Sequence, residues 1–290
     1  MTGLPGPLVD AEWLAAHLDD VVVADVRWVG GAGPEAGRAL YEVGHLPGAV
    51  YLGIDEDLAA PAFDGPGRHP LPPPGAFAAT MARVGIGDGA AVVAYDDARG
   101  SLAARLWWML DVLGERVALL DGGLASWLGP FETGPPRAAR QPAGFTSRPW
   151  PADAVVDADE VARALAAGDA TVLDVRMPER YRGDVEPLDP VAGHIPGAVS
   201  APWSDNLDER SGRFLDANAV RARFEGFGVG PDGHRAIAHC GSGVTACHDL
   251  FALRLAGLRG GRLYEGSWSD WVHDGTRPVA VGEEPEGTGP

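Results

Sequence analysis

Short apolar runs alternate with amphipathic stretches along most of the chain. The runs VVVADV (21–26) and TVLDV (171–175) are rich in β-branched residues, and each leads into an Asp-Val-Arg sequence. This composition is typical of strands buried on both faces of a parallel sheet. Longer segments at 101–114 and 244–258 have the length and apolar content of helices. The alternation predicts an α/β fold in which a mostly parallel sheet carries helices on both faces.

The same pattern occurs twice. Asp25 and Asp174 lie 149 residues apart, and so do the blocks that begin at residues 44 and 193. Two later pairs of blocks recur at a spacing of 144 residues. In chain order the remaining matched pairs are GHLPGAV (44–50) with GHIPGAV (193–199), AVVAYDD (91–97) with RAIAHCG (235–241), and DGGLASW (121–127) with EGSWSDW (265–271). Four blocks in the same order predict a duplicated domain.

The length of 290 residues also fits about two domains. Residues 129–153 are rich in Pro, Gly and Arg and lack periodicity, as linkers do. We therefore expect a first α/β domain at 1–135, a linker at 136–153 and a second α/β domain at 154–290.

Composition and charge narrow the class of protein. The chain is 46% hydrophobic and 22% charged, as in ordinary globular proteins, and its formal charge of −18 argues against nucleic acid or an anionic membrane as partner. No apolar stretch approaches the roughly 18 residues of a membrane span. The first residues show neither a basic nor an apolar signal region, and two cysteines exclude a disulfide framework, so we expect a cytoplasmic protein.

Lysine is absent, because all 23 basic residues are arginines. Pyridoxal phosphate enzymes, Schiff-base aldolases and the lysine-containing phosphate loop all need a lysine. The sequence therefore excludes these three classes.

The two copies differ at the end of one strand. Alignment places Asp96 opposite Cys240, and residues 97–101 opposite the GSGVT loop at 241–245. Ligands of open α/β sheets gather at the carboxyl ends of the strands. We therefore expect the second domain to be catalytic and the first to be a degenerate copy with Asp96 in place of the cysteine.

The loop after Cys240 has the composition of an anion site. Gly241 and Gly243 free the backbone to turn, so that successive N–H groups, including those of Val244 and Thr245, can point at one anion. The following helix adds the positive end of its dipole. Such surroundings favour a thiolate, which is the nucleophilic form of cysteine. The alternative is that Cys240 is a small buried apolar residue.

Other cysteine chemistries fit less well. A Cys-x5-Arg phosphatase loop requires arginine at position 246, which is alanine. Cys247 is seven residues from Cys240, too far for a Cys-x-x-Cys site, although a role under oxidation stays open. The spacing of His239, Cys240, Cys247 and His248 matches no standard zinc pattern, so we predict no metal site.

The tandem blocks and the CGSGVT loop resemble those of two-domain rhodanese-type sulfurtransferases over essentially the whole chain, and CGSGVTA resembles that of the 3-mercaptopyruvate sulfurtransferases within this family. The resemblance implies two rhodanese-like domains and no cofactor. It also implies that Cys240 takes the outer sulfur of a small-molecule donor as a persulfide. The persulfide then passes that sulfur to cyanide or to a thiol such as thioredoxin or a low-molecular-weight thiol.

The residues after the cysteine bear on the donor. Relatives that use thiosulfate, a dianion, carry basic residues there, whereas Gly241 and Ser242 add no charge, which favours mercaptopyruvate. Ser242 is expected either to protonate the departing enolate carbon or to stabilise the turn. The open alternatives are a thiosulfate sulfurtransferase and a non-enzymatic persulfide carrier.

The resemblance also assigns roles to residues outside this loop. Arg180 matches the family's first arginine for the substrate carboxylate, whereas Leu188 stands at the place of the second, so Arg182 is a possible substitute. His45 matches a histidine placed in a Ser–His–Asp relay. Its twin His194 occupies the same block of the second copy, so a structural role for both histidines is the competing interpretation.

Overall fold

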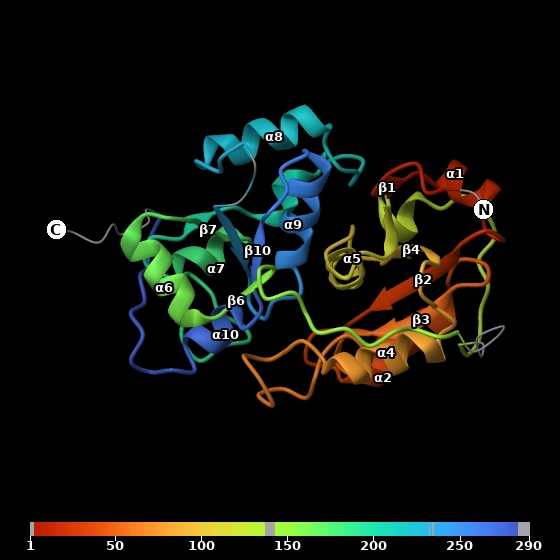
Figure 1. Ribbon diagram of the computed structural model, residues 1–290, viewed down its shortest axis with the longest axis horizontal. Coiled ribbons are helices and arrows are strands. Elements are labelled where there is room, and N and C mark those ends of the chain that lie inside the picture. The colour runs from red at the N-terminus through yellow and green to blue at the C-terminus, as the bar shows by residue number, and fades with distance from the viewer. Residues whose placement is uncertain (1–2, 137–142, 232, 234, 284–290) are drawn as a thin grey trace. The chain divides into compact units, whose positions relative to one another are not determined.

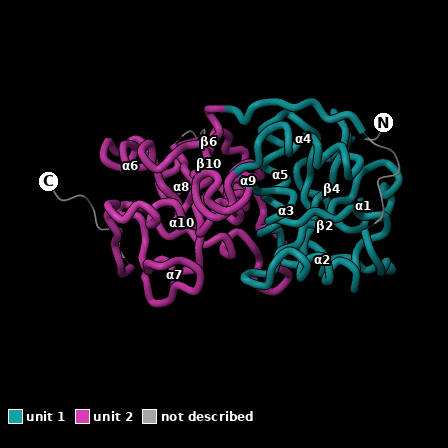
Figure 2. The backbone as a smooth tube through the Cα atoms, turned by 90° about the horizontal axis from the view of Figure 1, so that it is seen from below, with its two compact units in different colours: residues 1–60, 71–151 teal, residues 61–70, 152–290 magenta. Residues whose placement is uncertain are grey.

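A computed structural model describes residues 3–136, 143–231, 233 and 235–283. The chain divides into two compact units: residues 1–60 with 71–151, and residues 61–70 with 152–290 (Figure 2). Residues 61–70 group with the second unit, although the sequence pattern places them inside the first domain. Of the expected linker, the described residues 136 and 143–151 group with the first unit, and 152–153 group with the second.

The first unit is built on a five-stranded parallel sheet in the order β1-β5-β4-β2-β3 (Figure 1). Its strands are β1 (Leu8–Val9), β2 (Val22–Arg27), β3 (Val50–Gly53), β4 (Ala91–Tyr95) and β5 (Arg116–Leu120). Its helices are α1 (Ala11–Ala16), α2 (Pro34–Val43), α3 (Ile54–Asp57), α4 (Pro74–Arg83) and α5 (Ala103–Val112), followed by the 3-10 turn η1 (Gly123–Ser126).

Alternation along the strands divides the first core into two layers. Val23 and Val93 pack with Leu14 of α1 and Tyr41 of α2, which therefore cover one face of the sheet. Neighbouring strand residues such as Val92 point to the opposite face because side chains alternate along a strand. Helix α5, which packs on β4 and β5, covers that face. The expected sandwich of a sheet between helices is present in this unit.

The second unit repeats this architecture in the order β6-β10-β9-β7-β8, again with all strands parallel. Its strands are β6 (Val155–Val156), β7 (Thr171–Asp174), β8 (Val199–Ser200), β9 (Ala236–His239) and β10 (Arg262–Tyr264). Its helices are α6 (Ala158–Ala167), α7 (Pro178–Arg182), α8 (Ala217–Gly226), α9 (Ala246–Leu255) and α10 (Ser267–Trp271), with the 3-10 turn η2 (Trp203–Asn206).

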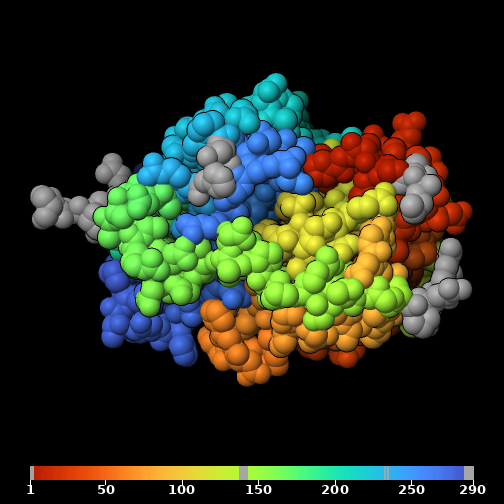
Figure 3. Space-filling view, viewed as in Figure 1, coloured from red at the N-terminus to blue at the C-terminus, as the bar shows by residue number. Residues whose placement is uncertain are grey.

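The second core has the same two layers. Val172 and Ile237 pack with Val161 of α6 and Trp268 of α10 on one face, and α9 packs against β9 and β10. The segment after α10 lies against α6, where the Arg277 guanidinium bonds a first-turn carboxylate of that helix at 2.7 Å (Figure 3). The duplicated α/β fold predicted from the sequence is confirmed.

The segment 61–70 is tied to the loop that opens α10. Gly67 has a φ of +75°, and a Cβ there would lie 2.4 Å from the carbonyl oxygen of Gly266, so only glycine permits this approach. The N–H of Arg68 donates to Ser269 Oγ at 3.1 Å, and Phe63 stacks on His273. These contacts explain why ten residues of the first half of the sequence belong to the second unit.

The predicted elements agree with the structure to within a few residues. The helices expected at 101–114 and 244–258 are α5 and α9, and the strands expected at 21–26 and 171–175 are β2 and β7. Within the described residues, no helix combines the length and the apolar character needed to cross a bilayer.

Candidate active site

Cys240 follows β9 directly, at the carboxyl end of the second sheet, and is 4% exposed. The chain then turns through residues 241–245 into α9, and the N–H of Ser242 points at the Cys240 sulfur, 3.5 Å away. The turn needs a left-handed residue at Gly243, whose φ is +79° and whose added Cβ would meet the Glu265 carbonyl at 2.3 Å. The thiol thus lies where a strand, a tight turn and a helix start meet.

The loop before α10 fixes the backbone around Cys240. The N–H of Cys240 donates to Ser267 Oγ at 3.0 Å, and the Ser267 hydroxyl donates in turn to the Tyr264 carbonyl at 2.9 Å. The N–H groups of Trp268 and Ser269 donate to the carbonyl oxygens of Cys240 and Gly241 at 3.0 and 2.9 Å. Both carbonyl oxygens are therefore engaged by this loop.

Ser267 holds an unusual backbone conformation, with a φ of +55°. Its counterpart in the first copy, at a spacing of 144 residues, is Gly123 with a φ of +57°. A left-handed conformation suits glycine and costs a side-chain-bearing residue about 1 kcal/mol or more. The second copy therefore accepts backbone strain at the position where a hydroxyl meets the Cys240 backbone.

The first copy shows what this turn binds. Asp96, the counterpart of Cys240, is fully buried, and its carboxylate accepts four backbone N–H bonds of 2.8–2.9 Å. The donors are Ala98, Gly100, Leu102 and Ala103. A strand–turn–helix junction of this kind collects N–H groups around one anion. In the first copy that anion is the protein's own side chain.

Ser242 contacts a histidine that the sequence analysis did not single out. His69 Nδ1 lies 2.6 Å from Ser242 Oγ, and both residues are buried. His69 belongs to the segment 61–70, so it reaches the site through the fold of the second unit. The signal in the sequence is an Arg-His pair within GPGRHPLPPP that has no counterpart in the second copy, 149 residues later.

His45, which the resemblance placed in the relay, shares its tyrosine contacts with its twin His194, but its Nε2 also lies 3.9 Å from a carboxylate oxygen of Glu132. Nδ1 of His45 pairs with the Tyr41 carbonyl at 2.8 Å and its ring stacks on Tyr41 at 3.8 Å. Nδ1 of His194 pairs with the Tyr181 carbonyl at 2.8 Å and its ring stacks on Tyr181 at 3.8 Å. Both histidines thus contact a tyrosine in the same way, whereas the contact with Ser242 belongs to His69.

Two guanidinium groups lie over Gly241. A Cβ on Gly241 would sit 3.0 Å from Arg68 Nη2 and 3.4 Å from Arg180 Nη1. Among the described residues, neither of these two nitrogens makes a hydrogen bond, although both guanidinium groups are ion-paired through other nitrogens. The missing side chain at position 241 thus leaves room for an anion in front of two donors. Arg180 is one of the expected binding residues, and Arg68 was missed.

Two acidic side chains form ion pairs with these arginines. Glu186 accepts from Arg180 at 2.6 Å, and Asp189 forms an ion pair with Arg68 and lies 3.5 Å from Arg180. Burial raises the pKa of Asp189, and the Arg68 guanidinium opposes that rise. Arg176, beneath them, pairs with Glu186 at 3.3 Å.

His239, next to the nucleophile, is buried and uncharged. Its Nε2 lies 3.7 Å from Asp174 Oδ2, but burial lowers the pKa of His239 despite that carboxylate. Burial is the largest single effect and by itself would raise the pKa of Asp174, but the charge and the hydrogen bonds of Arg176, with smaller effects beside them, together hold that pKa below its ordinary value. A neutral His239 supplies no charge to the thiol beside it.

The remaining predicted residues divide between the loop and the surface. Val244 is buried. The carbonyl oxygens of Val244 and Thr245 accept backbone hydrogen bonds from the first turn of α9, at 3.2 and 2.9 Å respectively. Arg182 instead pairs with Asp184 at 2.7 Å on the surface, and Leu188 is 45% exposed. Arg182 therefore makes no contact that marks it as the substitute for the missing arginine.

Cys247 lies inside α9, fully buried, and its thiol donates to the Gly243 carbonyl at 3.4 Å. Both cysteines are free. Within the ranges that the structure describes, no three His, Cys, Asp or Glu side chains are grouped as metal ligands would be.

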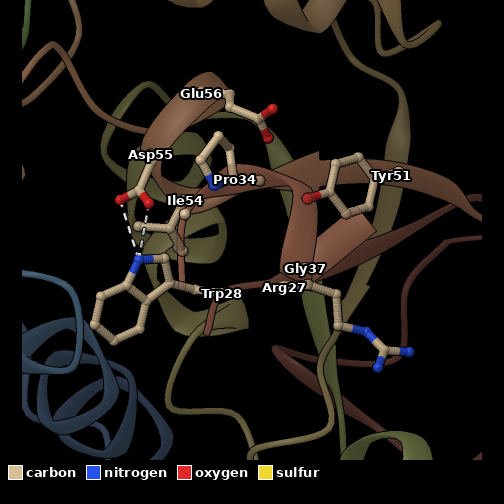
Figure 4. Close-up of a pocket in the computed structure, with 10 residues that line it drawn as sticks. Arg27, Trp28, Pro34, Gly37, Tyr51, Ile54, Asp55 and Glu56 are labelled. Atoms are coloured by element: carbon tan, nitrogen blue, oxygen red, sulfur yellow. Dashed lines mark hydrogen bonds between the residues drawn. The ribbon is translucent and has the colours of Figure 1, made fainter. Parts of the chain in front are cut away.

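The first unit has a hollow of its own at the carboxyl ends of β2 and β3, lined in part by Trp28, Tyr51 and Glu56 (Figure 4). The Trp28 indole N–H donates to both carboxylate oxygens of Asp55 at 3.0 Å. Burial and the neighbouring Asp57 raise the pKa of Glu56. This hollow holds acids and aromatic rings but no nucleophilic thiol.

The fold and the buried thiol at the carboxyl end of β9 define a class of protein. The Rhodanese-like domain family matches residues 10–129 and 157–274, and the chain belongs to that family. It is 44% identical over 283 residues to a Pseudomonas aeruginosa protein named "Probable 3-mercaptopyruvate sulfurtransferase", covering 95% of this chain and 98% of that one. It is 41% identical over 282 residues to the Mycobacterium tuberculosis protein "Putative thiosulfate sulfurtransferase SseB", covering 95% and 97%.

Solved structures agree with this assignment. The 3-mercaptopyruvate sulfurtransferase of Escherichia coli matches with a TM-score of 0.76 and 34% identity, covering 91% of this chain and 99% of that one. The Leishmania major enzyme of the same name gives a TM-score of 0.81 at 28% identity, covering 94% and 76%. The resemblance deduced from the sequence is confirmed at the level of family and fold.

Proposed function

We propose that the protein is a 3-mercaptopyruvate sulfurtransferase that carries the transferred sulfur as a persulfide on Cys240. The observation that carries the proposal is that two guanidinium nitrogens, Arg68 Nη2 and Arg180 Nη1, lie in front of Gly241 in the loop that follows Cys240. Two such groups can bind the two oxygens of the mercaptopyruvate carboxylate. The oxygens of thiosulfate can accept from the same groups, so the lack of added positive charge at Gly241 and Ser242 is what favours the monoanionic donor. The names of the similar proteins point to both donors.

The proposed first step moves one sulfur atom. The Cys240 thiolate attacks the donor sulfur, an S–S bond forms, and the C–S bond breaks with its electron pair moving to carbon as the enolate of pyruvate. Ser242 donates a proton to that carbon and is reprotonated through His69, 2.6 Å away. This relay assigns to His69 the role that the resemblance gave to His45.

The proposed second step returns the enzyme to its starting state. A thiolate acceptor attacks the outer sulfur of the persulfide, takes it, and releases the Cys240 thiolate. Thioredoxin, a low-molecular-weight thiol and cyanide all have the nucleophilic atom that this step needs. Both cysteines are free, and an exchangeable thiol persists in a reducing compartment, so we assign the reaction to the cytoplasm.

Mass spectrometry tests the proposal directly. Mixing the protein with 3-mercaptopyruvate should add the mass of one sulfur to the peptide that contains Cys240 and release one equivalent of pyruvate. Cys247→Ser is the matched control and should gain the same mass, whereas Cys240→Ser should gain none. A label on Cys247 alone would contradict the assignment.

Steady-state kinetics separate the two alternatives. A thiosulfate sulfurtransferase would show a higher kcat/KM for thiosulfate than for mercaptopyruvate with cyanide as acceptor. A non-enzymatic carrier would form one equivalent of persulfide but turn over slowly with any small acceptor. We expect mercaptopyruvate to have the higher kcat/KM, with many turnovers.

A further inference from the structure

Asp189 has an unusual position behind the two arginines of the site. Its side chain is only 3% exposed, its Oδ1 forms an ion pair with Arg68 Nη1, and its Oδ2 lies 3.5 Å from Arg180 Nη2. No described residue hydrogen-bonds that Oδ2. A buried carboxylate with one incompletely paired oxygen is costly to maintain.

The charges around Cys240 balance. Three guanidinium groups form the cluster, those of Arg68, Arg176 and Arg180, and three buried carboxylates face them, those of Asp174, Glu186 and Asp189. The cluster is formally neutral before the thiolate is counted. Two arginines meet the donor, yet the site carries no excess positive charge.

Glu186 and Asp174 have more complete partners than Asp189. Glu186 accepts from Arg180 and from the backbone N–H groups of Leu188 and Asp189, and Asp174 is held by two nitrogens of Arg176. Asp189 contacts the two arginines that face Gly241 and contributes a full negative charge there. It is the acid whose removal most directly changes the potential at the donor.

We propose that Asp189 is a specificity-determining residue, whose buried charge makes the site favour donors with one negative charge over donors with two. The inference rests on the proposed sulfur transfer at Cys240. In a given potential, the electrostatic free energy of a dianion is twice that of a monoanion. A neutral residue at position 189 therefore raises kcat/KM for a dianionic donor more than for a monoanionic one. Loss of the Asp189 charge also loosens Arg68 and Arg180, which weakens their binding of a substrate carboxylate.

The test compares donors that differ in charge but share the bond that breaks. Thiosulfate is a dianion and methanethiosulfonate is a monoanion, and each gives up its outer sulfur from a sulfur–sulfur bond. Asp189→Asn should raise the kcat/KM ratio of thiosulfate to methanethiosulfonate at least tenfold, with cyanide as acceptor. The same variant should shift the ratio of thiosulfate to 3-mercaptopyruvate in the same direction.

Two variants control for structure and charge. Asp184→Asn removes an exposed acid of the same loop, bonded to Arg182, and should leave both ratios unchanged. Asp189→Glu keeps the charge and should retain the wild-type ratios. Asp189→Asn should also make thiosulfate kinetics fall more steeply with ionic strength, a change that a loss of packing does not produce.

The kcat/KM ratios of the Asp189 and Asp184 variants either support or overturn the proposed role of Asp189. Unchanged ratios in Asp189→Asn, or an equal change in Asp184→Asn, would overturn the proposal. If the Asn variant melts early, Asp189→Ser replaces it as the neutral variant under the same criteria. The comparison of thiosulfate with methanethiosulfonate keeps this test separate from the proposed function. If the wild-type enzyme did not use mercaptopyruvate, the proposed function would be refuted, but the charge preference could still be measured with these two donors.

Discussion

Nδ1 of His69 lies 2.6 Å from the hydroxyl of Ser242, two residues after Cys240. A histidine in this position can return a proton to the serine after the serine has protonated the enolate carbon. The first prediction concerns which histidine does this.

We expect His69→Gln to lower kcat with mercaptopyruvate by about 10²- to 10⁴-fold, the usual contribution of a general acid or base. His45→Gln should lower thermal stability and leave kcat within a few-fold of wild type. His194→Gln is its matched control, because both rings stack on a tyrosine in the same way. Equal kcat losses in the His45 and His69 variants would contradict this assignment.

Ser267 yields a prediction in which two variants differ in strain. Glycine at 267 relieves the left-handed backbone, whereas alanine keeps it, and both remove the hydroxyl that accepts from the Cys240 N–H. Ser267→Gly should therefore be more stable than Ser267→Ala by about 1 kcal/mol in urea unfolding. Both should transfer sulfur more slowly than wild type. A glycine variant with full activity would show that the hydroxyl is dispensable.

The carboxylate clamp predicts a hierarchy among the arginines. Arg68→Ala and Arg180→Ala should each reduce kcat/KM for mercaptopyruvate by about 30- to 1,000-fold, equivalent to roughly 2–4 kcal/mol for loss of a charged partner. Arg182→Ala should change it little, since that side chain pairs with Asp184 on the surface. Circular dichroism controls for misfolding.

Leu188→Arg extends this test. Position 188 is exposed and has a leucine where the family's second arginine stands. Because Arg68 already supplies the second guanidinium, we expect Leu188→Arg to change KM for mercaptopyruvate by less than about threefold, a small effect typical of exposed charges. A large fall in KM would mean that the clamp of the natural protein is incomplete.

Asp249 in α9 predicts how stability depends on pH. It is fully buried, bonded to Asn206 at 2.6 Å and 3.8 Å from Arg223, and burial raises its pKa to about 7. Because the folded pKa exceeds the unfolded value, folding favours the protonated form. The stabilisation is complete below about pH 4 and is lost as the pH rises through 7.

Asp249→Asn removes this proton uptake. The asparagine keeps an oxygen that can accept from Asn206 but carries no charge at any pH. The variant should gain a few kcal/mol of unfolding free energy relative to wild type at pH 8, and little or nothing at pH 4. Urea unfolding at the two pH values measures this, and a difference independent of pH would contradict it.

The fold and the proposed nucleophile could be predicted from the sequence because the two copies of the repeat can be compared with each other. Matching blocks at spacings of 149 and 144 residues predicted two α/β domains, and the exchange of Asp96 for Cys240 marked the site. Strand and helix periodicity are local, so they survive without knowledge of the tertiary structure. The loop residues 241–245 followed from the same alignment.

Arg68 and His69 were not accessible in this way. They lie in a segment rich in Pro and Gly, have no counterpart in the second copy, and reach the site only because residues 61–70 pack against the loop of Gly266 and Ser269. No local pattern records such a long-range contact. His45 was selected by resemblance, and the matching tyrosine contacts of His45 and His194 give a structural reason for the recurrence of their sequence block.

The carboxylate of Asp96 acts as a permanent occupant of its own turn. Its four backbone donors are satisfied within the chain, so the turn of the first copy needs no small molecule to complete it, whereas in the proposed mechanism the turn of the second copy meets a sulfur anion. A cysteine placed at 96 would supply one sulfur where four donors now share two oxygens, with Arg99 in the left-handed position of Gly243 and Gly123 in the place of Ser267. A single substitution at 96 therefore does not reproduce the surroundings of Cys240 in the first copy.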